Sequence, residues 1–137
     1  MLDSMNDEIV KAMYETLPVE ITVIDENDRV IGWNRHDDRL FYRPETSMGV
    51  DFRECHPAES LHLVERIVSE MKSGARNEAR FWIDLTVDKT TGERHKVAIE
   101  FRALRDLKGR YLGCMECTTD VEWYRGLEGE HRLLDEA

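Results

Sequence analysis

The sequence predicts an α+β domain in which a five-stranded antiparallel sheet carries helices on one face, with flanking helices at the two ends. Three observations lead to this class. Five short segments are rich in β-branched and aromatic residues, as strands are. Polar connectors that contain Asn, Asp or Gly join neighbouring segments, as hairpin loops do. One amphipathic segment of helical period separates the first two strands from the last three.

The predicted strands fall into two groups. The first group is a hairpin in which EITVID and RVIGWN are joined by a turn at residues 26–28. The second group comprises three longer strands, over residues 79–87, 95–105 and 110–120. In the middle one, Val97, Ile99 and Phe101 alternate with small or polar residues. We therefore expect one face of the sheet to be buried and the other to meet water or a partner.

The main helix is predicted over residues 57–73. Pro57 suits the first helical position, where a missing N–H costs nothing, and Gly74 supplies the end of the helix. One side of this helix is wholly apolar and consists of Leu61, Leu63, Val64, Ile67, Val68 and Met71. His62 belongs to the opposite, polar arc. A role for His62 as a buried axial ligand of haem is therefore disfavoured, although it remains an alternative.

The chain divides into a central domain and two flanking segments. A helix is predicted over residues 6–17, with Pro18 after it, so residues 1–17 form an N-terminal flanking helix. Residues 18–121 form the central domain. The C-terminal segment, residues 122–137, is predicted as a helical tail, although Gly126 and Gly129 each cost about 1 kcal/mol in a helix.

Composition limits the possible partners of the chain. Its 137 residues include 19 Lys and Arg against 29 Asp and Glu, which gives a formal net charge of -10. This charge repels phosphate backbones and anionic membranes, so we expect neither nucleic acid nor membrane as a partner. No apolar run approaches a membrane span and the N-terminus lacks the pattern of a signal peptide. We expect a cytoplasmic protein whose three cysteines are free thiols.

The three cysteines invite chemical interpretations. Cys114 and Cys117 have the spacing of a zinc motif, but residues three apart on a strand point to opposite faces, and no further ligand pair accompanies them. We therefore predict no metal site. Cys55 precedes a helix start and lies beside His56, so a reactive thiol is one alternative. A small buried side chain at the edge of a pocket is favoured, because no resolving cysteine or orienting carboxylate is recognisable nearby.

Common catalytic signatures are missing from the sequence. It contains no P-loop, dinucleotide-binding, zinc-protease or nucleophile-elbow motif. The abundant carboxylates are expected to form a solvated surface rather than a catalytic pair. The sequence therefore predicts a protein that is not an enzyme.

Several segments in succession resemble a PAS domain. They are VIDENDRVIGWN at residues 23–34, Met-Gly at 48–49, HPAE at 56–59 and RDLKGRYLG at 105–113. More narrowly, CHPAES, ARFWI, ALRD, YLGCMECTTD and LEGEHRLLD resemble the PAS module that follows hemerythrin-like domains in bacterial and archaeal proteins. The resemblance implies a sheet that curves around a cavity capped by the central helices. It also implies a sensory or protein-interaction module in signal transduction.

A pocket is expected where the apolar side of the main helix meets the sheet, since ligand sites are concave and mostly apolar. Close packing of the same residues is the alternative. The cofactors of PAS domains vary, and the identity of any cofactor here stays open; the NCRFLQ motif of flavin-binding relatives is absent. The candidate lining residues are Phe52, Cys55, Val64, Ile67, Trp82, Phe101 and Cys117.

Three functional hypotheses follow. The leading one is a sensory or interaction domain that binds a small molecule and a signalling partner without catalysis. The others are a redox sensor that holds haem or another cofactor, and a thiol-based redox protein that uses Cys55. A homodimer through the flanking helices is also expected, because apolar residues recur on both of them: Ile9, Met13, Trp123, Leu127 and Leu134.

Overall fold

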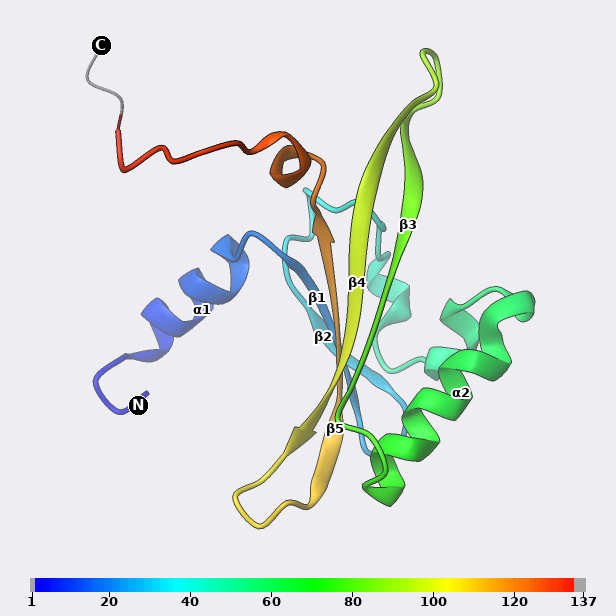
Figure 1. Ribbon diagram of the computed structural model, residues 1–137. Helices are drawn as coiled ribbons and strands as arrows, with labels where there is room; N and C mark the ends of the chain where they lie inside the picture. Colours follow the sequence, from blue (N-terminus) through cyan, green and yellow to red (C-terminus); the bar gives the residue numbers. More distant parts are fainter. Residues whose placement is uncertain (1, 135–137) are drawn as a thin grey trace.

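A computed structural model describes residues 2–134 and shows one antiparallel sheet with a long helix packed against it (Figure 1). The predicted α+β class is confirmed, and each predicted strand and each of the first two helices lies within two residues of its observed bounds. The elements are α1 (Asp7–Thr16), β1 (Glu20–Asp25), β2 (Val30–Trp33), η1 (Glu45–Ser47), η2 (Phe52–Cys55), α2 (Ala58–Ser73), β3 (Glu78–Asp88), β4 (Glu93–Arg105), β5 (Tyr111–Asp120) and η3 (Trp123–Gly126).

The five strands run in the spatial order β2-β1-β5-β4-β3, so the first strand pairs with the last. The chain must therefore pass from the edge strand β2 to the opposite edge strand β3, and α2 makes this crossing over one face of the sheet (Figure 1). Where β5 meets β1, a Cβ atom added at Gly113 would lie 2.1 Å from the carbonyl oxygen of Ile24. Only glycine allows the two backbones to approach so closely.

The core lies between α2 and this face of the sheet. Val64, Val68 and Met71 are the buried residues of α2, as the predicted apolar side requires. They pack against buried residues of β1, β2, η2, β4 and β5, which are Ile24, Val30, Phe52, Phe101 and Cys114. Each such side chain contributes about 1.5–3 kcal/mol when it is fully buried. At the end of the helix, Gly74 adopts a left-handed conformation (φ 84°) and its N–H reaches the last turn.

A buried amide joins α1 to the sheet. Asn34 is completely buried, and its Oδ1 accepts a hydrogen bond from the Ile21 N–H at 2.7 Å. Its Nδ2 donates to the carbonyl oxygens of Tyr14 at 2.8 Å and Val19 at 3.0 Å. One buried side chain thereby provides hydrogen-bond partners to three backbone groups.

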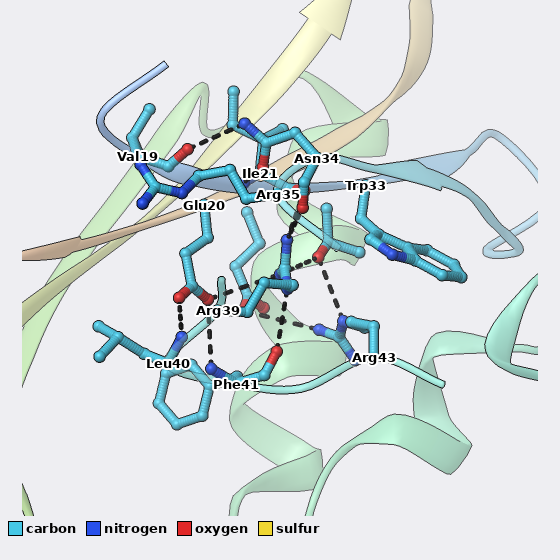
Figure 2. Close-up of polar contacts among 12 residues, drawn as sticks. Val19, Glu20, Ile21, Trp33, Asn34, Arg35, Arg39, Leu40, Phe41 and Arg43 are labelled. Atoms are coloured by element: carbon cyan, nitrogen blue, oxygen red, sulfur yellow. Dashed lines mark hydrogen bonds and ion pairs between the residues drawn. The ribbon is translucent and has the colours of Figure 1, made fainter. Parts of the chain in front are cut away.

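A buried ion pair holds the segment that follows β2. The guanidinium of Arg39 donates to the carbonyl oxygens of Asn34 at 2.7 Å and Phe41 at 3.0 Å, and to Thr22 Oγ1 at 3.1 Å (Figure 2). Its Nη2 lies 3.6 Å from the Glu20 carboxylate, which in turn accepts hydrogen bonds from the backbone of residues 40 and 41. The ion pair thus fixes a segment that has no regular structure of its own.

The C-terminal segment differs from its prediction as a helical tail over residues 122–137. Only the short η3 turn is helical, and residues 127–134 form no regular element; the prediction for residues 135–137 lies outside the described part of the chain. The physical reason is the cost of Gly126 and Gly129, which no buried apolar contact offsets: Trp123, Leu127 and Leu134 are exposed. No helix within residues 2–134 is long and apolar enough to cross a bilayer.

The Asn34 amide gives a first prediction. Asn34→Ala should lower the free energy of unfolding by about 3 kcal/mol, because buried backbone groups lose their partners. Urea denaturation measures this loss. Asn27→Ala, at an exposed position in the β1–β2 turn, is the matched control and should change the free energy by less than about 0.5 kcal/mol. Equal stability of the two variants would contradict the bridging role of Asn34.

Candidate functional site

A small cavity lies between α2 and the sheet, with a volume of about 30 Å³. A water molecule needs about 10–15 Å³ measured in this way, so the cavity has room for one or two waters. The lining residues that come from strands are Thr22, Ile24, Val30, Phe101, Cys114 and Glu116. Those from the connecting segment and α2 are Arg43, Phe52, Cys55, His56, Val64 and Val68.

Strand register builds the floor of this cavity. Thr22 of β1 lies directly opposite Glu116 of β5, and Glu116 lies directly opposite Phe101 of β4. Directly opposed residues share one face of a sheet, so these three side chains form a row across three strands. Glu116 is the charged member of the row and lies between a hydroxyl and an aromatic ring. A carboxylate is thereby placed beneath α2, at a cavity with mostly apolar walls.

His56 reaches this carboxylate from the segment before α2. Its Nδ1 lies 2.9 Å from the carbonyl oxygen of Phe52, and its Nε2 lies 3.6 Å from Oε2 of Glu116. The side chain of His56 is only 18% exposed, and its ring lies near the rings of Phe52 and Phe101. The Glu116 carboxylate raises the pKa of His56; burial opposes this effect and the Phe52 carbonyl adds to it.

Arg43 approaches Glu116 from the other side. Its Nε donates to Thr22 Oγ1 at 3.2 Å, and its Nη2 lies 3.8 Å from Oε1 of Glu116. The side chain of Arg43 is 13% exposed and that of Glu116 is 18% exposed. At 3.6 and 3.8 Å, Glu116 forms ion pairs with His56 and Arg43 but no direct hydrogen bond to either.

Two of the three cysteines line the cavity. Cys114 on the floor is buried, and burial raises its pKa to about 12, so its thiol stays protonated at neutral pH. Cys55 is the last residue of η2 and lies at the cavity next to His56. Cys117 belongs to the same unbroken strand as Cys114 and lies on the other face of the sheet, as its spacing on a strand requires.

Four of the predicted lining residues do lie at the cavity, namely Phe52, Cys55, Val64 and Phe101. Ile67 packs against the core but does not line the cavity. The placement of Trp82 and Cys117 is corrected, because both belong to the face opposite α2. Trp82 pairs with Ala98, next to the inward-facing Phe81 and Ile99, and is 71% exposed. Alternation along the strand forces this outcome.

The lining residues predicted from the sequence did not include Arg43 or Glu116, the two charged residues of the site that lie outside the Cys-His-Pro motif at residues 55–57. Arg43 sits in an irregular segment, and Glu116 sits between two cysteines on a strand whose register could not be read from the sequence. His56 was considered as part of a helix start and as a neighbour of the Cys55 thiol, but it was not predicted as a lining residue of the cavity. The missed apolar members, Ile24, Val30, Val68 and Cys114, belong to regular elements whose inward faces become clear once the strands are paired.

The position of His62 and the arrangement of possible metal ligands both bear on cofactor binding. His62 is exposed on α2 and does not line the cavity, as its place on the polar arc predicts. Among residues 2–134 there is no group of three or more His, Cys, Asp or Glu side chains arranged to hold a metal ion. The histidine that the fold brings to the cavity is therefore His56.

Comparison with known families fits this geometry. The sequence model of the family described as the PAS domain matches residues 10–122, which is most of the chain. The chain belongs to the PAS domain family. PAS domains are typically sensory modules of signal transduction, and they are in general not catalytic. No curated protein gives a significant match to the chain.

Solved structures share the fold of this PAS domain. A C-terminal domain from Streptococcus mutans superposes with a TM-score of 0.76 at 23% identity, over 88% of this chain and 89% of that one. A PAS domain from Colwellia psychrerythraea gives 0.60 at 15% identity, over 85% and 97%. VqmA of Vibrio cholerae, in a structure bound to DPO, gives 0.57 at 16% identity, over 82% and 56%. At these identities the likeness shows the fold.

His56 gives a prediction on pH dependence. Its pKa in the folded protein lies above the ordinary value of 6.5, so its ion pair with Glu116 stabilises the fold fully below about pH 6.5. This stabilisation is lost as the pH rises through the folded pKa. The thermal midpoint of the natural protein should therefore fall relative to that of His56→Gln as the pH increases from about 6 through the folded pKa of His56.

An NMR titration of the imidazole protons measures the same property directly. Glu116→Gln should lower the pKa of His56, because the carboxylate that favours the charged imidazole is removed. His62→Gln, on the exposed side of α2, is the control and should leave the His56 titration unchanged. A His56 titration that does not respond to Glu116→Gln would contradict the coupling of these two groups.

Proposed function

We propose that this PAS domain is a sensory module that binds a small molecule in the cavity between α2 and the sheet, and that it catalyses no reaction of its own. The observation that carries the proposal is the convergence of Arg43, His56 and Glu116 on one apolar cavity. A mostly apolar cavity with a few convergent polar groups is the usual form of a small-molecule site.

Energetics support recognition rather than stability as the role of these charges. Removing three ionisable groups from bulk water costs several kcal/mol for each ion, and good hydrogen-bond geometry is needed to recover that cost. Glu116 has no direct hydrogen bond to either cation in this arrangement. A well-packed apolar core would stabilise the domain at least as well. The charges are better explained as groups that await a ligand.

The size of the cavity indicates how a ligand is accommodated. A volume of about 30 Å³ suits a very small molecule, and anything larger requires the wall to move. The movable part of the wall is the irregular segment that carries Arg43. Arg39 and Glu20 are among the residues that attach this segment to the sheet (Figure 2). Ligand binding would therefore alter contacts between this segment and the sheet.

The end of β5 provides a route for the signal. Glu116 at the cavity and Asp120 belong to the same strand, and the chain leaves the sheet after Asp120. The departing segment is attached to β4 by a hydrogen bond from the Val121 N–H to the Lys96 carbonyl oxygen at 2.9 Å. The Glu122 carboxylate accepts from the Lys96 N–H at 2.6 Å. A shift of β5 would thus reach the segment from which a signalling partner could read it.

Similarity to other proteins supports the same proposal. VqmA, which shares the fold, is bound to DPO in one of its structures. The segments that resemble PAS modules of hemerythrin-associated proteins are consistent with a role in bacterial or archaeal signalling. A cytoplasmic location is part of the proposal, and it rests on the composition of the chain.

A cavity-filling variant tests the proposed site. Val64→Phe should abolish the binding of any small molecule that native mass spectrometry detects on the natural protein, because the larger side chain fills the cavity. An absorption spectrum of the same sample tests for a coloured cofactor. Overpacking should lower the free energy of unfolding by about 1–3 kcal/mol, so the fold is checked by circular dichroism.

Leu63→Phe is the matched control for this experiment. Leu63 lies on the same helix as Val64 but is half exposed and does not line the cavity. It should leave ligand binding unchanged. If the natural protein and Val64→Phe bound every small molecule equally well, the cavity would not be the ligand site.

We propose further that the domain forms a homodimer through α1. None of the residues of α1 is buried, and Ile9 and Met13 on one side of it are 50% and 45% exposed. An amphipathic helix gains most of its stability from packing its apolar side against another element. In Figure 1, α1 lies on the side of the sheet opposite α2, where a second copy has access to it. VqmA, which shares the fold, is described as a dimer.

Multi-angle light scattering tests the dimer. The natural protein should have twice the mass of one chain at micromolar concentration, and Ile9→Gln with Met13→Gln should convert it to a monomer. Glu8→Gln with Lys11→Gln alters exposed polar residues of the same helix without changing its net charge and should leave the dimer intact. A monomeric natural protein would refute the proposal.

A further inference from the structure

The charge state of His56 follows from its two neighbours. The Phe52 carbonyl oxygen, 2.9 Å from Nδ1, can only accept a hydrogen bond, so Nδ1 carries a proton. On the other side, Nε2 faces the Glu116 carboxylate at 3.6 Å. A lone pair on Nε2 would be repelled by that carboxylate, whereas an N–H is attracted. These neighbours favour a proton on both nitrogens, so below its folded pKa His56 is an imidazolium at the wall of the cavity.

The guanidinium of Arg43 keeps unused donors at the same cavity. Of its three nitrogens, Nε donates to Thr22 Oγ1. Among residues 2–134, no acceptor lies within hydrogen-bond distance of Nη1 or Nη2, since the ion pair with Glu116 is 3.8 Å long. A guanidinium has five N–H donors and no acceptor. Arg43 thus presents its terminal donors to whatever occupies the cavity.

The side chains at the cavity carry more positive than negative charge. Arg43 and His56 contribute two positive charges, and Glu116 contributes one negative charge. The nearby Glu20 does not correct this, because its carboxylate is engaged by Arg39 and by the backbone N–H groups of residues 40 and 41. With His56 protonated, the cavity therefore has one positive charge in excess, in a chain whose net charge is -10.

We propose that the ligand of this cavity is a small monocarboxylate. That a ligand binds in this cavity rests on the proposed function. Its two oxygens would accept hydrogen bonds from Arg43 and His56, because planar guanidinium donors suit a carboxylate and charge-assisted bonds of this kind are strong. Its short hydrocarbon body would contact Val30, Val64 and Val68. The cavity volume of about 30 Å³ favours acids with few carbons, and even these require the segment that carries Arg43 to move.

Propionate is the probe, and propionamide and propylamine are its neutral and cationic counterparts of similar size. Two-dimensional NMR of the natural protein should show saturable shifts at Glu116 and Cys114 with propionate. Neither counterpart should bind with better than about one tenth of that affinity, because only the carboxylate satisfies both cations. Tighter binding of propionamide or propylamine at these residues would overturn the carboxylate assignment and leave the ligand site of the proposed function standing.

The pH dependence of propionate binding is a second test of the proposal, and it needs no variant protein. Propionate is ionised both at about pH 6 and at a pH above the midpoint that the NMR titration gives for His56, whereas His56 loses its positive charge between these two values. Propionate should therefore bind more weakly at the higher pH. Binding that is equal at the two pH values, or absent at both, would overturn the proposal; the Val64→Phe experiment with other small molecules would still decide the proposed function.

Arg43→Met tests the other cation. It should weaken propionate binding at least about tenfold, and Arg43→Lys, which keeps a charge without the planar fork, should restore part of the affinity. Arg110→Met is the matched control, since Arg110 is an exposed arginine before β5 and does not line the cavity. Unchanged affinity in a folded Arg43→Met protein would overturn the role of Arg43 and with it the proposal.

Discussion

The pairing of β1 with β5 is the constraint on which the rest of this structure depends. It joins the first hairpin to the three-stranded C-terminal part of the sheet, and it forces the chain to cross from one edge of the sheet to the other. It also places Thr22 opposite Glu116, which in turn lies opposite Phe101. Without this register the cavity would have no floor, and the carboxylate that organises its charges would lie elsewhere.

Polar groups in this domain serve two physically different purposes. Asn34 and Arg39 make short hydrogen bonds to backbone carbonyl oxygens and so hold irregular segments in place. Arg43, His56 and Glu116 are also largely buried, but the distances between their charged atoms exceed those of hydrogen bonds. A network with satisfied partners contributes to specificity of the fold, whereas a loosely paired one keeps donors free for a ligand.

Much of the fold was predictable because it is local. Turn residues at 26–28, the apolar side of α2 and the alternation in β4 each depend on neighbours in sequence, and the elements appear within two residues of their expected bounds. The C-terminal tail is the exception. Its apolar residues predicted a helix, but the two glycines weaken that helix, and Trp123, Leu127 and Leu134 stay exposed instead of packing in the core.

The sequence by itself determined the strands and the main helix, the opposite placement of Cys114 and Cys117, and the solvent-facing position of His62, because each follows from the period of one element. Only the tertiary structure decided which face of β3 meets α2, and so placed Trp82 on the face opposite α2. It alone also decided which charged side chains meet at the cavity. Arg43, His56 and Glu116 are far apart in sequence. Their convergence depends on strand register and on the path of an irregular segment, and neither has a periodic signature.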